Sequence, residues 1–439
     1  MKKRFVSLLL SLGLALSFLV ALPATAYGAK SDYHTEDINF VNGLIVGNGL
    51  SWTLWDSDTI EEAPSDWGGF VVWDTSATPY RIVELYIDYL DLTQLPSTLP
   101  TALEVLECQG NNLTALPPLH DGLQTLACFD NLLTGLPSPL PGSLQILDCS
   151  YNLITGLPAL PESLIWFWCE FNLLTGLPVL PDGLGYLNCS GNPLAALPAL
   201  PDSLQYLECY DNGLTGLPAL PAGLVGLDCS DNKLPGLPLP LPSGLIGLDI
   251  SNNLITAQPY PLPDGMRYFY CDYNRITSIN VANCSYSLEE LSVTGNPLTE
   301  LILADTCTVY LKTIGVGLIN VISIDLHTES EEFAIIELQA IPGANWKFDS
   351  WINEFDNDYD GEPDDYFFNY VSFDVDEDFN TVTIGYRDLI TEVTVTAKFV
   401  QLPTTPGTGD YAWMMIIAAL SVLALGGGLL HYRRRQLAA

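Results

Sequence analysis

The sequence predicts a solenoid with short parallel β-strands on a concave face, an extended convex side and little helix, followed by a small β-rich domain. Three observations support this. An Asn recurs every 20 to 22 residues, at positions 111, 131, 152, 172, 192, 212, 232, 253, 274 and 296. Proline recurs in the second half of each repeat, as in the segment 217–221, which excludes an α-helix there. Beyond residue 324 the period ends, and β-branched and aromatic residues alternate.

Each repeat contains a short strand whose alternate side chains point inward. In the repeat that ends at Asn212, Leu207 and Cys209 are the inward residues, and we expect them to stack on their copies in neighbouring coils. The Asn at the following bend is expected to satisfy backbone groups of adjacent coils. The pattern resembles the leucine-rich repeat in its shortest bacterial class, and this implies a leucine-rich repeat solenoid over residues 81–324. An atypical last unit is expected near Leu311 and Ile314.

One inward position is usually a cysteine. It is filled by Cys108, Cys128, Cys149, Cys169, Cys189, Cys209, Cys229 and Cys271. Ile250 and Val293 replace it in two repeats, so we expect a packing position with buried free thiols. Disulfides along the ladder are one alternative, but parallel stacking gives a poor torsion angle. A metal is another, but no His or CxxC motif accompanies the ladder. Cys284 and Cys307 lie outside it, and whether they form a bridge is left open.

The amino-terminal residues predict export and a capped solenoid. Residues 1–26 combine Lys2, Lys3 and Arg4 with an apolar run and a small-residue cleavage site, which is typical of a signal peptide. Residues 27–80 resemble the amino-terminal cap of leucine-rich repeat proteins. The resemblance implies a helix and a strand over the first coil, with Trp67 and Trp73 in the cap core.

The carboxy-terminal residues predict a surface anchor. Residues 403–410 form a linker whose TPGTG segment resembles the LPxTG sorting signal, with Thr405 where that signal has Leu. The resemblance implies that a sortase cuts between Thr408 and Gly409 and joins the chain to peptidoglycan. An apolar segment at 411–430, long enough to span a membrane before processing, precedes a basic cytoplasmic tail at 431–439. A plain membrane anchor is the alternative, and both place the protein outside the cell.

Residues 325–402 resemble the internalin-type β-repeat of bacterial surface proteins, with Phe348 and Trp351 in its FxxW motif. An acidic loop interrupts this module. Its candidate calcium ligands are Asp356, Asp358, Asp360, Glu362 and Asp364. The spacing is that of a calcium-binding loop, but Phe367 replaces the bidentate Glu. A solvated acidic loop without Ca²⁺ is the alternative, and we expect no required cofactor.

The formal net charge of -37 argues against nucleic acid as a partner. The four histidines, at positions 34, 120, 327 and 431, accompany no nucleophile arrangement, so we expect no enzyme activity. We expect exposed aromatic and acidic side chains on the concave face to bind a ligand. These are Trp166, Trp168, Phe171, Tyr186, Tyr206, Tyr210, Tyr268, Tyr270, Glu170 and Glu208.

Together these features predict a surface-displayed adhesion or protein-binding protein of a Gram-positive bacterium, anchored in the cell wall or membrane. Its partner would be a protein or glycan on a host or another cell. The alternative is a structural cell-wall component without a specific ligand.

Overall fold

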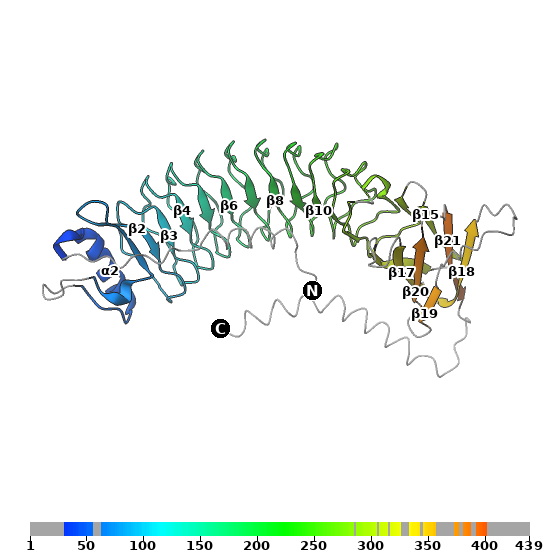
Figure 1. Cartoon of the computed structure of the whole chain (residues 1–439), viewed down its shortest axis with the longest axis horizontal. Coiled ribbons are helices and arrows are strands. Elements are labelled where there is room, and N and C mark those ends of the chain that lie inside the picture. Colours follow the sequence, from blue (N-terminus) through cyan, green and yellow to red (C-terminus); the bar gives the residue numbers. More distant parts are fainter. Residues whose placement is uncertain are drawn as a thin grey trace.

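The computed structural model describes residues 30–55, 63–284 and 287–304, together with strands at 307–314, 317–325, 333–342, 346–356, 373–376, 381–387 and 392–401. Figure 1 shows a curved rod of stacked coils with a helical cap at one end and a β-rich part at the other. The predicted signal peptide, linker, apolar segment and basic tail lie outside the described residues. Within those residues, no helix is long and apolar enough to cross a membrane.

The cap covers the first coil. It consists of η1 (Lys30–Asp32), α2 (Thr35–Asn48), η2 (Ser65–Trp67) and β1 (Val71–Asp74). Asp37 is 1% exposed and accepts hydrogen bonds from Arg81 Nε and from the backbone N–H of Ile82, both at 2.9 Å. These bonds join α2 to the first solenoid strand. Trp67 is buried in the cap core, and Trp73 packs against it partly buried.

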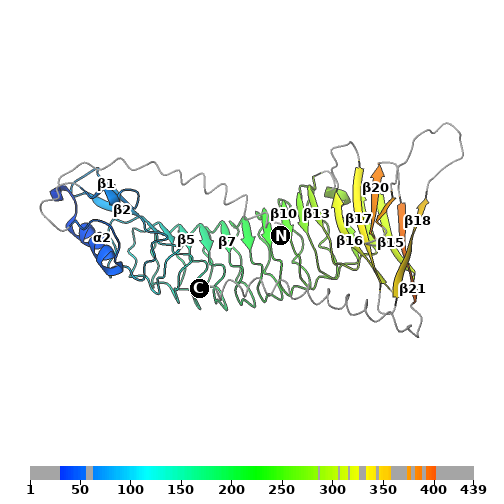
Figure 2. The ribbon, with the colours of Figure 1, turned by 90° about the horizontal axis from the view of Figure 1, so that it is seen from below.

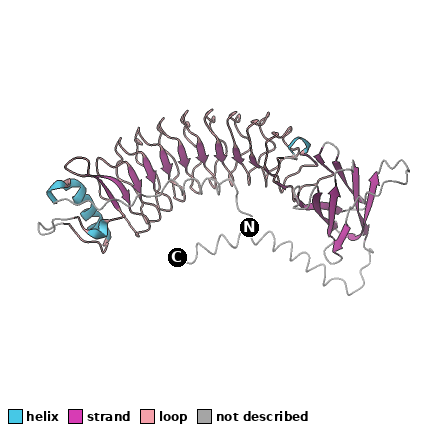
Figure 3. Ribbon diagram, in the orientation of Figure 1, coloured by secondary structure: helices cyan, strands magenta, loops and turns pink. Residues whose placement is uncertain are grey.

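The coils contribute one short strand each to a continuous sheet. The strands are β2 (Arg81–Tyr86), β3 (Val105–Glu107), β4 (Thr125–Ala127), β5 (Ile146–Asp148), β6 (Trp166–Trp168), β7 (Tyr186–Asn188), β8 (Tyr206–Glu208), β9 (Gly226–Asp228), β10 (Gly247–Asp249), β11 (Tyr268–Tyr270) and β13 (Glu290–Ser292). They pair in parallel and in register, so that Leu147, Phe167 and Leu187 are direct neighbours in the core. Figure 2 shows these strands along one concave side. Among the residues that the structure describes, helix is confined to the cap and one late turn, η3 (Ala282–Cys284) (Figure 3).

A ladder of buried Asn side chains joins the coils. Asn192 Nδ2 donates to the carbonyl oxygens of Cys169 at 3.0 Å and Cys189 at 3.1 Å. Asn192 Oδ1 accepts from the backbone N–H of Leu174 at 3.0 Å. The same bonds recur from coil to coil, for example at Asn131. The predicted role of the Asn residues is therefore confirmed.

The cysteine ladder is a packing feature. All eight ladder cysteines are buried and free, which confirms the prediction from the sequence. Burial raises the pKa of Cys108 and Cys189 to about 12, so these thiols are not ionised at neutral pH. Cys284 is also buried and free. The side chain of Cys307 is not among those that the structure describes, so a bridge between the two stays an open question.

The β-rich part continues the solenoid sheet and adds a second sheet. Its strands are β12 (Ser278–Asn280), β14 (Glu300–Ala304), β15 (Cys307–Ile314), β16 (Gly317–Asp325), β17 (Phe333–Pro342), β18 (Trp346–Asp356), β19 (Phe373–Asp376), β20 (Thr381–Arg387) and β21 (Glu392–Gln401). The first sheet runs on from β13 through β16, β17, β20 and β19, and the second has the order β12-β14-β15-β21-β18.

The repeat predicted near Leu311 and Ile314 is not a coil. These residues belong to β15, which pairs antiparallel with β14 and parallel with β21. The prediction was wrong because a regular β-strand also places apolar residues at spacings that a repeat strand uses.

Candidate functional site on the concave face

The concave face is formed by the first and third residues of each three-residue solenoid strand. The middle residue points into the core: Phe167 in β6 is fully buried, whereas Trp166 and Trp168 on either side of it are half-buried. In strands β3 to β13, no first or third position holds Lys or Arg. Carboxylates occupy these positions at Glu107, Asp148, Glu208, Asp228, Asp249 and Glu290.

The aromatic cluster, which we define as Trp166, Trp168, Tyr186 and Tyr206, lies across three neighbouring strands. The Trp166 and Trp168 rings are stacked, with centroids 5.9 Å apart and planes at 11°. The Tyr186 ring lies 4.9 Å from that of Trp168 and 5.7 Å from that of Trp166. Tyr206 continues the cluster, with its ring centroid 6.5 Å from that of Tyr186. Mutual ring contacts hold these side chains in fixed orientations.

A polar network lies beside the aromatic cluster. The Tyr186 hydroxyl donates to Glu208 Oε1 at 2.8 Å, and Asn188 Nδ2 donates to Glu208 Oε2 at 3.2 Å and also to Glu170 Oε2. Burial and the Glu208 carboxylate raise the pKa of Tyr186 well above its usual range. Asn188, which sequence reasoning did not single out, therefore links two predicted site residues. The only signal in the sequence was that Asn188 stands at a position that five other coils fill with Asp or Glu.

Three predicted site residues are buried, although we expected exposed side chains at these positions. Tyr186 and Glu208 are each 2% exposed, and Tyr210 is 5% exposed. The prediction of an exposed side chain was wrong for these residues because neighbouring strands lie only about 4.8 Å apart. At that spacing, large side chains on adjacent coils cover one another.

The structure places Phe171 on the rim of the solenoid, by which we mean the bend after each strand, next to the ladder Asn. It adopts a left-handed backbone with φ of 49°, as does Tyr151 with φ of 52°. Their rings stack at 4.7 Å, and Phe171 lies 6.3 Å from Tyr210. Gly191 is the next rim residue, and a Cβ there would lie 2.5 Å from the Phe171 ring. The ring thus occupies the space that a side chain would fill in the following coil.

Tyr268 and Tyr270 form a separate group near the β-rich part. The Tyr268 hydroxyl donates to Glu289 Oε2 and the Tyr270 hydroxyl to Glu290 Oε2, both at 2.6 Å. Arg267 lies over the Tyr268 ring at 5.6 Å and forms an ion pair with Glu289. The structure therefore does not bring these two tyrosines together with the aromatic cluster.

Acidic residues in the middle of the face are costly to ionise. Burial raises the pKa of Asp148 to about 6. Burial, with the neighbouring Asp228 carboxylate, raises the pKa of Asp249 to about 7. Asp228 and Asp249 are direct partners in the register of β9 and β10, so their charges repel each other.

We expect the solenoid to be more stable at pH 5 than at pH 7.5. Aspartate in an unfolded chain titrates near about 3.9, so between that pH and about 7 the folded protein binds more protons than the unfolded chain. The stability that these protonated aspartates contribute is complete at pH values below the pKa of Asp in the unfolded chain. It is lost as pH rises through the pKa that the same groups have in the folded protein. Asp249→Asn should remove about 1 to 2 kcal/mol of this pH dependence, measured by chemical denaturation.

The coil that contains β7 already has an Asn at the position equivalent to Asp249. Asn188 Oδ1 accepts from the Ser190 N–H at 3.0 Å, as Asp249 Oδ1 accepts from the Ser251 N–H at 2.8 Å. An Asn at position 249 therefore keeps the turn. Glu162→Gln, on an exposed side chain, is the control. An unchanged pH profile in Asp249→Asn would contradict this account of the ladder.

No metal site is seen in the part of the chain that the structure describes, where no three His, Cys, Asp or Glu side chains gather as ligands. Asp356 is the last residue of β18, and Asp358, Asp360, Glu362 and Asp364 lie outside the described residues. Thr408 and Gly409 lie outside them too. Calcium binding and sortase cleavage therefore stay predictions.

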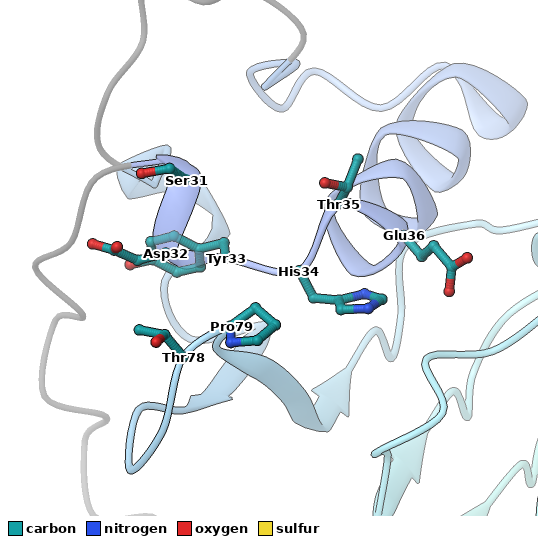
Figure 4. Close-up of a pocket in the computed structure, with 8 residues that line it drawn as sticks. All are labelled: Ser31, Asp32, Tyr33, His34, Thr35, Glu36, Thr78 and Pro79. Atoms are coloured by element: carbon teal, nitrogen blue, oxygen red, sulfur yellow. The ribbon is translucent and has the colours of Figure 1, made fainter.

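A pocket of about 500 Å³ lies at the cap, where α2 begins (Figure 4). His34 and Glu36 line it on one side, and Thr78 and Pro79 on the other. It belongs to the end of the rod and contains none of the predicted ligand-binding residues.

No protein-family model and no curated protein matches the chain. Several solved structures are similar to it. YopM, a leucine-rich effector protein from Yersinia pestis, is 31% identical over 50% of this chain and 73% of its own, with a TM-score of 0.43. YopM from Yersinia enterocolitica WA-314 is 27% identical over 53% of this chain and 74% of its own, with a TM-score of 0.33. The functional domain of InlJ from Listeria monocytogenes, which includes a cysteine ladder, is 18% identical over 86% of this chain and 100% of its own, with a TM-score of 0.34.

Proposed function

Because the chain is a leucine-rich repeat solenoid with a rigid aromatic cluster on its concave sheet, we propose that it is a binding protein that captures a protein partner on this face. The observation that carries the proposal is the stacked pair Trp166 and Trp168, which is half-buried against Tyr186 and flanks the buried Phe167. Half-buried tryptophans that are already ordered lose little side-chain freedom on binding. Such residues are typical interface hot spots.

The acidic side chains around the cluster favour a basic partner. In strands β3 to β13 the concave positions contain carboxylates and no Lys or Arg, so a basic protein would be attracted before contact. This attraction should raise the association rate and weaken with added salt. A glycan partner would bind with little salt dependence, which separates the two classes.

We expect Trp166→Ala combined with Trp168→Ala to weaken binding at least about tenfold, because each hot-spot aromatic is typically worth about 2 kcal/mol. The partner is first identified by cross-linking and pull-down with the full chain, and its affinity for both proteins is then measured by calorimetry. Val179→Ala is the matched control, since Val179 is 85% exposed and lies in the extended half of its coil. Equal affinity of the double variant and the native chain would exclude the aromatic cluster as the site.

The proposal includes display outside a Gram-positive cell, with the chain joined to peptidoglycan after cleavage between Thr408 and Gly409. It is supported by the order of signal peptide, sorting-like motif, apolar segment and basic tail in the sequence. We expect a peptidoglycan hydrolase to release the protein from intact cells without detergent. Release by detergent alone, with residues 411–430 still present by mass spectrometry, would instead indicate a membrane anchor.

A further inference from the structure

We infer that the rim of the solenoid beside strands β4 to β8 is a second interaction surface, which accepts an extended segment with two apolar side chains between two basic ones. The rim patch, as we define it, consists of Leu132, Tyr151, Leu153, Phe171 and Leu173. It lies beside the concave face rather than on it, and none of its members belongs to the aromatic cluster.

The rim patch is apolar and open to solvent. Leu132 and Leu153 are 45% exposed, and Tyr151 and Leu173 are 50% exposed. The three leucines follow the ladder Asn in three successive coils, a position that holds Pro, Gly and Lys in the next three. A contiguous group of exposed large apolar side chains is unusual on a soluble surface and marks an interaction site.

Two residues of the rim patch also adopt a backbone conformation that is unfavourable for an aromatic residue. Tyr151 and Phe171 occupy the left-handed position that Asp130, Gly191 and Asp211 fill in neighbouring coils. Asp and Gly tolerate this conformation well, whereas an aromatic residue there is strained. The stacking of the two rings at 4.7 Å offsets part of this cost and joins them into one continuous apolar surface.

Carboxylates bracket this surface along the axis of the solenoid. Asp130 stands at the same rim position one coil before Tyr151, and Asp211 stands two coils after Phe171, both exposed. Four coil steps of about 4.8 Å place these carboxylates roughly 19 Å apart. In an extended peptide, alternate side chains on one face are about 6.6 Å apart, so the first and fourth span roughly 20 Å. A basic, apolar, apolar, basic series on one face of a strand therefore matches the spacing of the rim.

The probe is a labelled synthetic peptide with the core Arg-Ser-Leu-Ser-Phe-Ser-Arg, titrated with the full chain by fluorescence anisotropy. We expect it to bind at least tenfold more tightly than two control peptides, one with Leu and Phe replaced by Ser and one with both Arg replaced by Glu. Leu153→Ser with Leu173→Ser should weaken binding by about the same factor. Asp130→Asn with Asp211→Asn should flatten its salt dependence. Val179→Ser, another exposed apolar position, is the matched control and should change nothing.

The Trp166→Ala and Trp168→Ala variant separates this inference from the proposed function. Peptide binding that survives in this variant and fails in the leucine variant supports the rim. Equal binding of the peptide and its apolar-deleted control, or unchanged binding by the leucine variant, overturns the inference and leaves the concave site untouched. Loss of binding in the tryptophan variant alone would assign the peptide to the concave face and also overturn it. The melting temperature of each variant checks that the fold is intact.

Discussion

Asn192→Ala is expected to lower the free energy of unfolding of the solenoid by about 3 to 4 kcal/mol. The side chain is 4% exposed and makes four hydrogen bonds, to the carbonyl oxygens of Cys169, Cys189 and Ser190 and from the N–H of Leu174. Alanine leaves buried backbone groups of two coils without these bonds, and each unsatisfied group costs about 1 to 3 kcal/mol. The measurement is chemical denaturation of the full chain followed by circular dichroism.

Asn192 forms hydrogen bonds to the preceding coil, so its removal should lower the free energy of unfolding by more than the removal of an ordinary buried amide side chain. In a solenoid each coil contacts only its neighbours, so a broken link weakens the interface between two coils and lowers cooperativity. Asn112→Ala is the control, because Asn112 is exposed and lies beside the ladder residue Asn111. If both variants unfold at the same denaturant concentration, the ladder does not carry the stability assigned to it.

Phe167→Ala is expected to destabilise the protein by about 3 to 5 kcal/mol. Phe167 is fully buried between Leu147 and Leu187 in the register of β5, β6 and β7. Truncation removes the apolar contacts of the ring and leaves a cavity that the regular stacking of the coils cannot close. The measurement is the shift of the unfolding midpoint in denaturant at constant slope.

Phe167→Leu is the matched variant for this position. Leucine fills the same position in both neighbouring coils, so the chain already packs it there. We expect this variant to lose roughly 1 kcal/mol, well below the loss for alanine. A similar loss in both variants would indicate that the position tolerates no repacking. A negligible loss in both would mean that Phe167 is not a core residue.

Much of the solenoid could be predicted because its core is periodic. The spacing of the Asn residues located every coil from 111 to 296, and the exchange of Cys for Ile250 or Val293 identified a packing position. Both inferences depend only on contacts that repeat identically in each coil. The residues of β15 were misassigned because apolar alternation describes a strand without specifying its partner.

The candidate site was harder to predict because its details depend on contacts between unlike coils. Trp168 covers Tyr186 only because these residues stand in adjacent coils, and a pattern read within one repeat contains no such information. Phe171 was assigned to the concave face because strand alternation was extended past the strand, where the backbone turns left-handed. Side-chain size at neighbouring positions would have indicated the burial of Tyr186.

The parallel series of strands from β2 to β13 is covered at both ends, and this affects how the protein avoids self-assembly. A stack of near-identical parallel strands presents, at each end, an edge that would pair with another copy of itself and extend into a fibre. Here β1 lies antiparallel on β2 at one end, and β16 lies antiparallel beside β13 at the other. An antiparallel strand ends the parallel series, so no further coil in the same register can be added. These two end strands therefore oppose end-to-end stacking of one rod on another.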